Sequence, residues 1–122
     1  MKLHAAAPTH LYTITGYGAD FVQINAERHT NHLIVTPEAL HPWSVRHFDA
    51  LTPDDFSVLL SLGVDVVILG TGTRQRFAHP RLIQHLTQAR IGVECMDLQA
   101  ACRTYNILMS EERKVAAALL FE

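Results

Sequence analysis

The feature that most constrains this fold is an apolar run, residues 64–69 with Asp65 as its one charged residue, that ends directly in Gly70-Thr71-Gly72. A strand that is covered on both faces has such a sequence, because neither face meets water. Open α/β sheets bind their ligands beyond the carboxyl ends of such strands. The run therefore predicts a central strand, and the residues that follow it are the first candidates for a site.

The length and composition limit the class of protein. The 122 residues suit one domain, so we treat residues 1–122 as a single unit. With 48% hydrophobic and 18% charged residues the chain is expected to be globular. A net charge of -2 without a block of like charges argues against a nucleic-acid partner. No stretch approaches the ~18 apolar residues that cross a bilayer, so we expect no membrane insertion.

Two observations bear on the compartment. Residues 1–8 carry one positive charge but no long apolar core, which argues against a secretory signal. Cys95 and Cys102 are the only cysteines and form no C-x-x-C motif, so we expect both to be buried thiols in a reducing environment. The sequence thus predicts a cytoplasmic protein.

The first half of the chain is typical of short antiparallel strands. β-branched and aromatic residues cluster at 11–15, 21–24 and 32–35, with a shorter group at 43–45. A glycine-rich turn at 16–20 separates the first two groups. Sequential strands with short turns predict an antiparallel meander.

The second half alternates helices and strands. Thr52 and Pro53 predict a helix start, and Gly63 predicts its left-handed end. After the central strand, Pro80 is expected to open a second helix that ends by Gly92. Residues 92–96 then predict a strand parallel to the first, which completes a βαβ unit.

The carboxyl-terminal third is less uniform. Asp97 is expected to cap a third helix with an apolar stripe, and Asn106 is expected to end it in the left-handed conformation. Residues 115–121 are ambiguous: their alanine content favours a helix, whereas an uninterrupted apolar run suits a buried strand.

The loop after the central strand is the candidate ligand site. Its glycines would let backbone N–H groups approach an anion, its threonines add hydroxyls, and arginine offers a planar fork. It is not a dinucleotide fingerprint, because Gln75 stands where the third glycine would be, and it lacks the lysine of a phosphate-binding P-loop. A structural turn with solvated arginines is the alternative interpretation. The candidate anion-binding residues are Gly70, Thr71, Gly72, Thr73, Arg74 and Arg76.

No other cluster predicts chemistry. The eight histidines show none of the i, i+4 pairing with a carboxylate that marks a hydrolytic zinc site. Nothing near either cysteine lowers a thiol pKa in a recognisable way. We therefore assign no metal, no cofactor and no catalytic residue.

Several segments together resemble the Mth938-like family, also known as DUF498. The likeness covers nearly the whole chain and is most specific in its last third. It implies a single compact α/β domain with a mixed β-sheet and packed helices, and it implies that residues 115–120 form a strand. The segments that carry it are the run into Gly70-Thr71-Gly72, Pro80, residues 92–97, Ala101, residues 104–108, Glu112-Arg113 and residues 115–119.

The resemblance also bears on function. The family includes a mitochondrial assembly factor of respiratory complex I, and no catalytic residue is carried over from it. We therefore expect a non-enzymatic interaction protein that binds protein partners, respiratory subunits among them, and assists assembly of a membrane complex. The alternative is an anion-binding or small-molecule-binding protein, or an enzyme, that uses loop 70–76. Self-association is a further expectation, since strand edges need covering.

Overall fold

The computed structural model describes residues 10–122. Residues 1–8, from which we argued against a secretory signal, lie outside the described residues. Two sheets form the framework. A mixed sheet of five strands has the order β5-β4-β8-β6-β7, and a smaller antiparallel sheet has the order β1-β2-β3. This confirms the predicted α/β domain with an antiparallel meander, a βαβ unit and packed helices.

The five-stranded sheet combines both strand directions. β6 (Val66–Thr71) runs parallel to β7 (Gly92–Met96) on one side and to β8 (Val115–Leu120) on the other. β4 (Leu33–Val35) is antiparallel to β8 and to β5 (Leu40–Pro42). The βαβ unit predicted from the second half is therefore present as β6-α2-β7.

The run that was ambiguous between helix and strand is β8, the central strand. Its side chains alternate between the two faces: Val115, Ala117 and Leu119 join one apolar cluster, and Ala116, Ala118 and Leu120 join the other. All six residues are fully buried. Burial on both faces explains the uninterrupted apolar sequence, and pairing with β4 and β6 overrides the helix preference of alanine.

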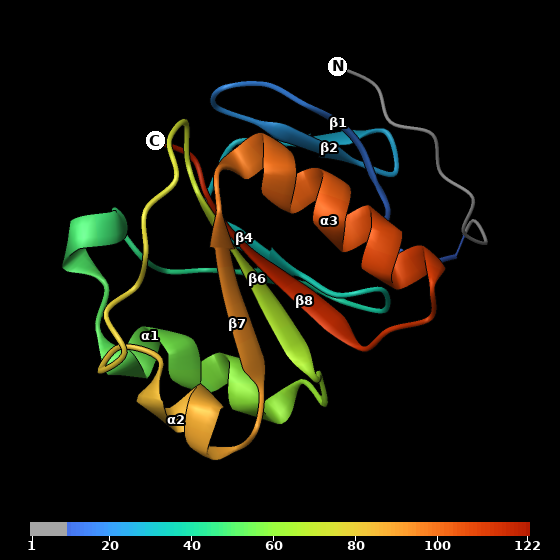
Figure 1. Ribbon diagram of the computed structural model, residues 1–122. Coiled ribbons are helices and arrows are strands. Elements are labelled where there is room, and N and C mark those ends of the chain that lie inside the picture. The colour runs from blue at the N-terminus through green and yellow to red at the C-terminus, as the bar shows by residue number, and fades with distance from the viewer. Residues whose placement is uncertain (1–9) are drawn as a thin grey trace.

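Helices cover both faces of this sheet (Figure 1). α3 (Leu98–Ser110) and the meander lie on one face, whereas α1 (Pro53–Ser57), the 3₁₀ helix η2 (Val58–Ser61) and α2 (Gln84–Gln88) lie on the other. A further 3₁₀ turn, η1 (Phe48–Ala50), precedes α1. The predicted caps hold: Thr52 precedes α1, Asp97 Oδ1 accepts from Ala100 N–H at 2.9 Å, and Gly63 has φ +69°.

The meander begins later than predicted, and its third strand is β3, because the strand predicted at 32–35 is β4 of the five-stranded sheet. β1 (Ile14–Tyr17) includes residues expected in the turn, and β2 (Val22–Ile24) agrees with the prediction. β3 (Glu27–His29) was missed because its residues are polar and exposed or half-buried. The strand expected at 43–45 is also wrong, since β5 ends at residue 42 and Trp43 follows it as a buried residue.

Two helix boundaries differ from the expectation. Pro80 does not open a helix: residues 80–83 form turns, α2 begins at Gln84, and Arg90 rather than Gly92 takes the left-handed conformation, with φ +62°. Asn106 does not end α3 either, because its side-chain amide holds β1: Oδ1 accepts from Ile14 N–H at 3.0 Å and Nδ2 donates to Ile14 O at 2.7 Å.

Candidate functional site

The carboxyl ends of β6, β7 and β8 meet at one edge of the sheet. Thr71 pairs with Leu120, and Gly70 pairs with Met96, so these three strands finish side by side. Loop 70–76 leaves the sheet here, which is where the sequence placed the candidate site. We call this region the carboxyl edge.

The two glycines of the loop are required by close packing. A Cβ on Gly70 would lie 2.9 Å from Leu119 Cδ2 and 3.2 Å from Ala101 Cβ, so its absence lets α3 approach the sheet. Gly72 has φ +89°, and a Cβ there would lie 2.7 Å from the backbone oxygen of Glu122. Both glycines therefore have a structural role at this edge.

The Thr71 side chain stabilises the loop through hydrogen bonds of its buried hydroxyl. This residue is fully buried. Its Oγ1 accepts from Arg76 N–H at 3.0 Å, and its hydroxyl hydrogen has two carbonyls within reach, Arg74 O at 2.7 Å and Met96 O at 3.1 Å. The hydroxyl thus bonds to the backbone of the loop and of β7.

Arg76 folds back onto Glu122, which follows β8. Its Nη2 donates to Glu122 Oε1 at 2.6 Å and to Thr71 O at 3.0 Å, and its guanidinium carbon lies 4.7 Å from the centroid of the Phe48 ring. Phe48 N–H donates to Glu122 Oε2 at 2.5 Å, and Thr73 N–H donates to Glu122 O at 2.9 Å. Arg76, Phe48 and Glu122 thus close the carboxyl edge.

These contacts set the ionisation of Glu122. Partial desolvation by itself favours the neutral acid, but the hydrogen bonds from Arg76 and Phe48 outweigh it and hold the pKa of Glu122 below its ordinary value. The carboxylate is therefore charged at neutral pH and balances the Arg76 guanidinium. Neighbouring residues carry no signal for this cluster, because Glu122 lies 46 residues from Arg76 and 74 from Phe48.

The remaining loop residues face outward. Thr73, Arg74 and Phe77 are exposed, and Phe77 retains 77% of its possible surface. A small cavity of about 190 Å³ lies beside the loop and is lined by Gly72, Thr73 and the first residues of α3. The structure thus brings all six predicted residues to one edge but uses Thr71 and Arg76 internally. Anion binding there stays a prediction.

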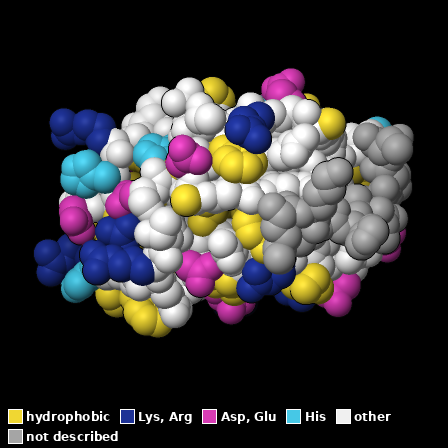
Figure 2. All heavy atoms as spheres, turned by 90° about the horizontal axis from the view of Figure 1, so that it is seen from above, with side chains coloured by type: hydrophobic (Ala, Val, Ile, Leu, Met, Phe, Trp, Pro, Cys, Tyr) yellow, Lys and Arg dark blue, Asp and Glu magenta, His cyan; other side chains and the backbone are white. Residues whose placement is uncertain are grey.

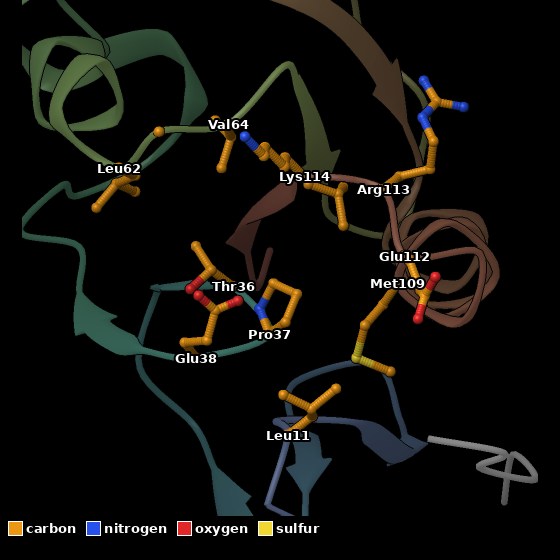
Figure 3. A pocket seen from close by; sticks show the side chains of 12 residues that line it. Leu11, Thr36, Pro37, Glu38, Leu62, Val64, Met109, Glu112, Arg113 and Lys114 are labelled. Atoms are coloured by element: carbon orange, nitrogen blue, oxygen red, sulfur yellow. The ribbon is translucent and has the colours of Figure 1, made fainter. Parts of the chain in front are cut away.

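A larger cavity of about 320 Å³ lies at the opposite end of the sheet (Figure 3). The turn between β4 and β5, the loop before β6 and the end of α3 form its walls. Met109 points toward Leu11, whereas Arg113 is directed away from the cavity. Glu38 and Lys114 bring opposite charges to the lining. No motif predicted this cavity, because its walls come from segments that are distant along the chain.

A third cavity, also about 320 Å³, includes His29, His32 and His41 in its lining. Both ring nitrogens of His32 contact the backbone: Nδ1 accepts from Phe121 N–H at 3.1 Å, and Nε2 lies 3.1 Å from Arg46 O. Among residues 10–122, no group of histidine, cysteine and acidic side chains is arranged to hold a metal ion.

The buried polar groups of α3 also have structural roles. Burial raises the pKa of the Cys102 thiol to about 12, which leaves it protonated at neutral pH and unsuited to nucleophilic attack. Burial likewise raises the pKa of Tyr105 above its ordinary value, and its hydroxyl donates to Tyr12 O at 2.7 Å. Cys95 is half-buried, and Ala78 N–H lies 3.5 Å from its sulfur.

Within residues 10–122, none of the helices combines the length and the hydrophobicity that a membrane span requires.

The chain is 33% identical to a zebrafish (Danio rerio) protein named NADH dehydrogenase (ubiquinone) 1 alpha subcomplex assembly factor 3, over 98% of this chain and 68% of that one. An uncharacterized protein of Rhodobacter capsulatus is 36% identical over 88% of this chain and 82% of its own length. The chain spans 57–68% of the length of the assembly factors that it matches.

Solved structures agree with this comparison. A crystal structure of a Bordetella parapertussis protein superposes with a TM-score of 0.88 at 36% identity, over 95% of this chain and 100% of that one. A solution structure from Bordetella pertussis, described as a Mth938-like domain, has a TM-score of 0.83 at 32% identity, over 99% and 92%. Residues 14–120 match the family described as "Protein of unknown function (DUF498/DUF598)", and the chain therefore belongs to this Mth938-like family.

Proposed function

We propose that this protein is a cytoplasmic, non-enzymatic interaction protein that assists the assembly of a respiratory membrane complex. The observation that carries the proposal is the 33% identity to an assembly factor over 98% of this chain. The two free cysteines, one of them buried, fit a reducing compartment.

The geometry of the carboxyl edge supports a binding role over catalysis. In the described part of the chain, Arg76 and Glu122 neutralise each other and the Thr71 hydroxyl serves the backbone. The exposed side chains on the outside of the loop stay available for contact with another molecule, and the largest of them are Arg74 and Phe77. An exposed phenyl ring next to an arginine suits a protein contact, because aromatic residues and arginine are enriched at interfaces.

The test is a deletion strain of the organism that encodes the chain. Native gels should show a partly assembled respiratory complex and a loss of NADH oxidation by membranes, and a plasmid copy should restore both. Affinity capture of the tagged protein should recover subunits of the same complex. Full assembly and normal oxidation in the deletion strain would overturn the proposal.

Binding of a small anion or another small molecule, or catalysis on one, at loop 70–76 is the second candidate. The observation that favours it is Nε of Arg76, which is buried without a hydrogen-bond partner in the described residues. Phosphate, citrate and nucleotides are the ligands to test by thermal unfolding. A ligand at 100 times its Kd should add about 2.7 kcal/mol to the free energy of unfolding. An unchanged melting temperature across that panel would exclude these ligands.

A further inference from the structure

Charge is distributed unevenly along this chain. Residues 66–93 contain four arginines and no aspartate or glutamate, although the whole sequence has 10 basic and 12 acidic residues. The other residues therefore carry six basic and twelve acidic side chains. Although the net charge of the protein is small, residues 66–93 are basic and the rest of the chain is acidic.

The fold places this segment along the outer edge of the five-stranded sheet. β7 is an edge strand, and the loop from β6 descends beside it to α2 (Figure 1). Gln75 Nε2 donates to Cys95 O at 3.0 Å near one end of β7, and Arg90 lies two residues before the other end. The two ends of the segment are therefore separated by the approximate length of this five-residue strand, about 16 Å at ~3.3 Å per residue.

We name this surface the basic strip and define it by five exposed residues: Arg74, Phe77, His79, Arg81 and Arg90. Figure 2 shows blue and cyan side chains gathered at the left end of the molecule, where the loop lies in Figure 1. Acidic side chains occur nearby too. Glu94 lies on β7, the strand that follows the strip along the chain, and Glu122 lies close in space, where it is paired with Arg76.

We propose that the basic strip is a docking surface for an acidic segment of a partner protein, with Phe77 as its apolar anchor. The inference rests on the proposed function, because it names the chemistry of the protein partner. Exposed cations attract acidic side chains and speed encounter, and burial of a phenyl ring supplies affinity that charge alone lacks in water.

The observations favour a polypeptide over the two other anionic surfaces. One phenyl ring offers less apolar burial than a single acyl chain, which by itself binds a bilayer only marginally. Duplex DNA carries one charge per ~1.7 Å, far denser than the cations of the strip, and the acidic remainder of the chain would repel it. A flexible acidic segment can match a few cations spaced along one strand.

The test measures binding of a fluorescent peptide of Glu-Glu-Leu repeats by anisotropy, at ~20 mM and ~300 mM salt. A peptide with Gln in place of Glu is the probe control. Phosphatidylserine vesicles and a short DNA duplex are the probes for the two other anionic surfaces, a lipid bilayer and a nucleic acid. We expect the acidic peptide alone to bind, and more weakly in high salt.

Two charge-matched variants locate the contact. Arg74→Glu/Arg81→Glu should weaken binding about tenfold or more, because two attractions are lost and two repulsions gained. Arg113→Glu/Lys114→Glu, with the same change in net charge at the other end of the sheet, should change it less than about twofold. Phe77→Ser should weaken binding about tenfold without changing its salt dependence. Circular dichroism confirms that each variant is folded.

Equal losses in the two charge-matched variants would overturn the proposal, as would vesicle or DNA binding without peptide binding, or no binding at all. The outcome is separable from that of the proposed function. If wild type and Arg74→Glu/Arg81→Glu both recover respiratory subunits from cells and both restore the deletion strain, the assembly role stands and the basic strip fails. If the deletion strain assembles its complex normally while the peptide data hold, the assembly role fails and the basic strip stands.

Discussion

The two ends of the five-stranded sheet differ in what fills them. At the carboxyl edge, Arg76, Phe48 and Glu122 occupy the place where open α/β sheets bind ligands. At the opposite end, a cavity of about 320 Å³ stays open between Glu38 and Lys114. The comparison teaches that position in the fold indicates where a site can form, whereas the side chains from distant segments decide whether it is still available.

Two glycines with positive φ provide the sharpest test of this difference. Gly72→Ala at the carboxyl edge should lower the free energy of unfolding by about 3 kcal/mol or more, because left-handed strain adds to a 2.7 Å clash with Glu122 O. Gly63→Ala at the open end should cost only about 1 kcal/mol, since no atom lies within 4 Å of its new Cβ. Urea unfolding followed by circular dichroism measures both, and equal losses would contradict the comparison.

Two buried threonines form the next pair. Thr71→Val removes the hydroxyl that serves Arg76 N–H and two carbonyls, so the variant should lose about 2–3 kcal/mol of unfolding free energy. Thr36→Val near the open cavity removes hydrogen bonds to Ala39 alone and should lose about 1 kcal/mol. The measurement is the midpoint of urea unfolding, compared between variants whose unfolding free energy depends on urea concentration with the same slope. A larger loss at Thr36 would show that the open end depends more on internal hydrogen bonds.

The pH dependence of Glu122 tests the ion pair. Because its folded pKa is lowered, the carboxylate stabilises the fold above the ordinary glutamate pKa, and this contribution is lost as pH falls through the folded pKa. Glu122→Gln lacks that contribution at every pH. The difference in unfolding free energy between wild type and variant should therefore shrink from about pH 7 to about pH 3. A constant difference would mean that the charge contributes nothing.

The smallest effects are expected at the open cavity. Glu38→Gln and Lys114→Gln should each change the free energy of unfolding by less than ~0.5 kcal/mol, because both residues are exposed and no side-chain hydrogen bond of theirs is present among residues 10–122. Thermal unfolding is sufficient to measure this. A loss comparable to that of Thr71→Val would show that this end, too, is stabilised by its polar residues.

The central part of the fold was predictable because its signals are local. The run at 64–69, its glycine pair and the parallel strand at 92–96 each show in consecutive residues. β8 was different: alanines favour a helix in isolation, and only the pairing of Ala117 and Ala118 with β4 and of Val115–Leu120 with β6 makes it a strand. β3 was missed because its polar side chains carry no alternating pattern.

The candidate site could be located from the sequence but not described. The position of loop 70–76 follows from the strand before it, whereas the partners of Arg76 come from residues 48 and 122. Asn106 was interpreted as a helix end by its own preference, and its actual role depends on β1, 92 residues away. Such long-range contacts leave no mark in neighbouring residues.

The position of β8 has a consequence for synthesis on the ribosome. β8 lies between β4 and β6, yet it follows every other described strand along the chain. Translation proceeds at about 5–20 residues per second, so the β4–β5 and β6–β7 pairs emerge as two half-sheets, each with an edge that awaits the same strand. A nascent chain that stalls before Val115 would expose both edges to neighbouring chains. Closure of the sheet is therefore a late event, and until it occurs both half-sheets keep an unpaired edge.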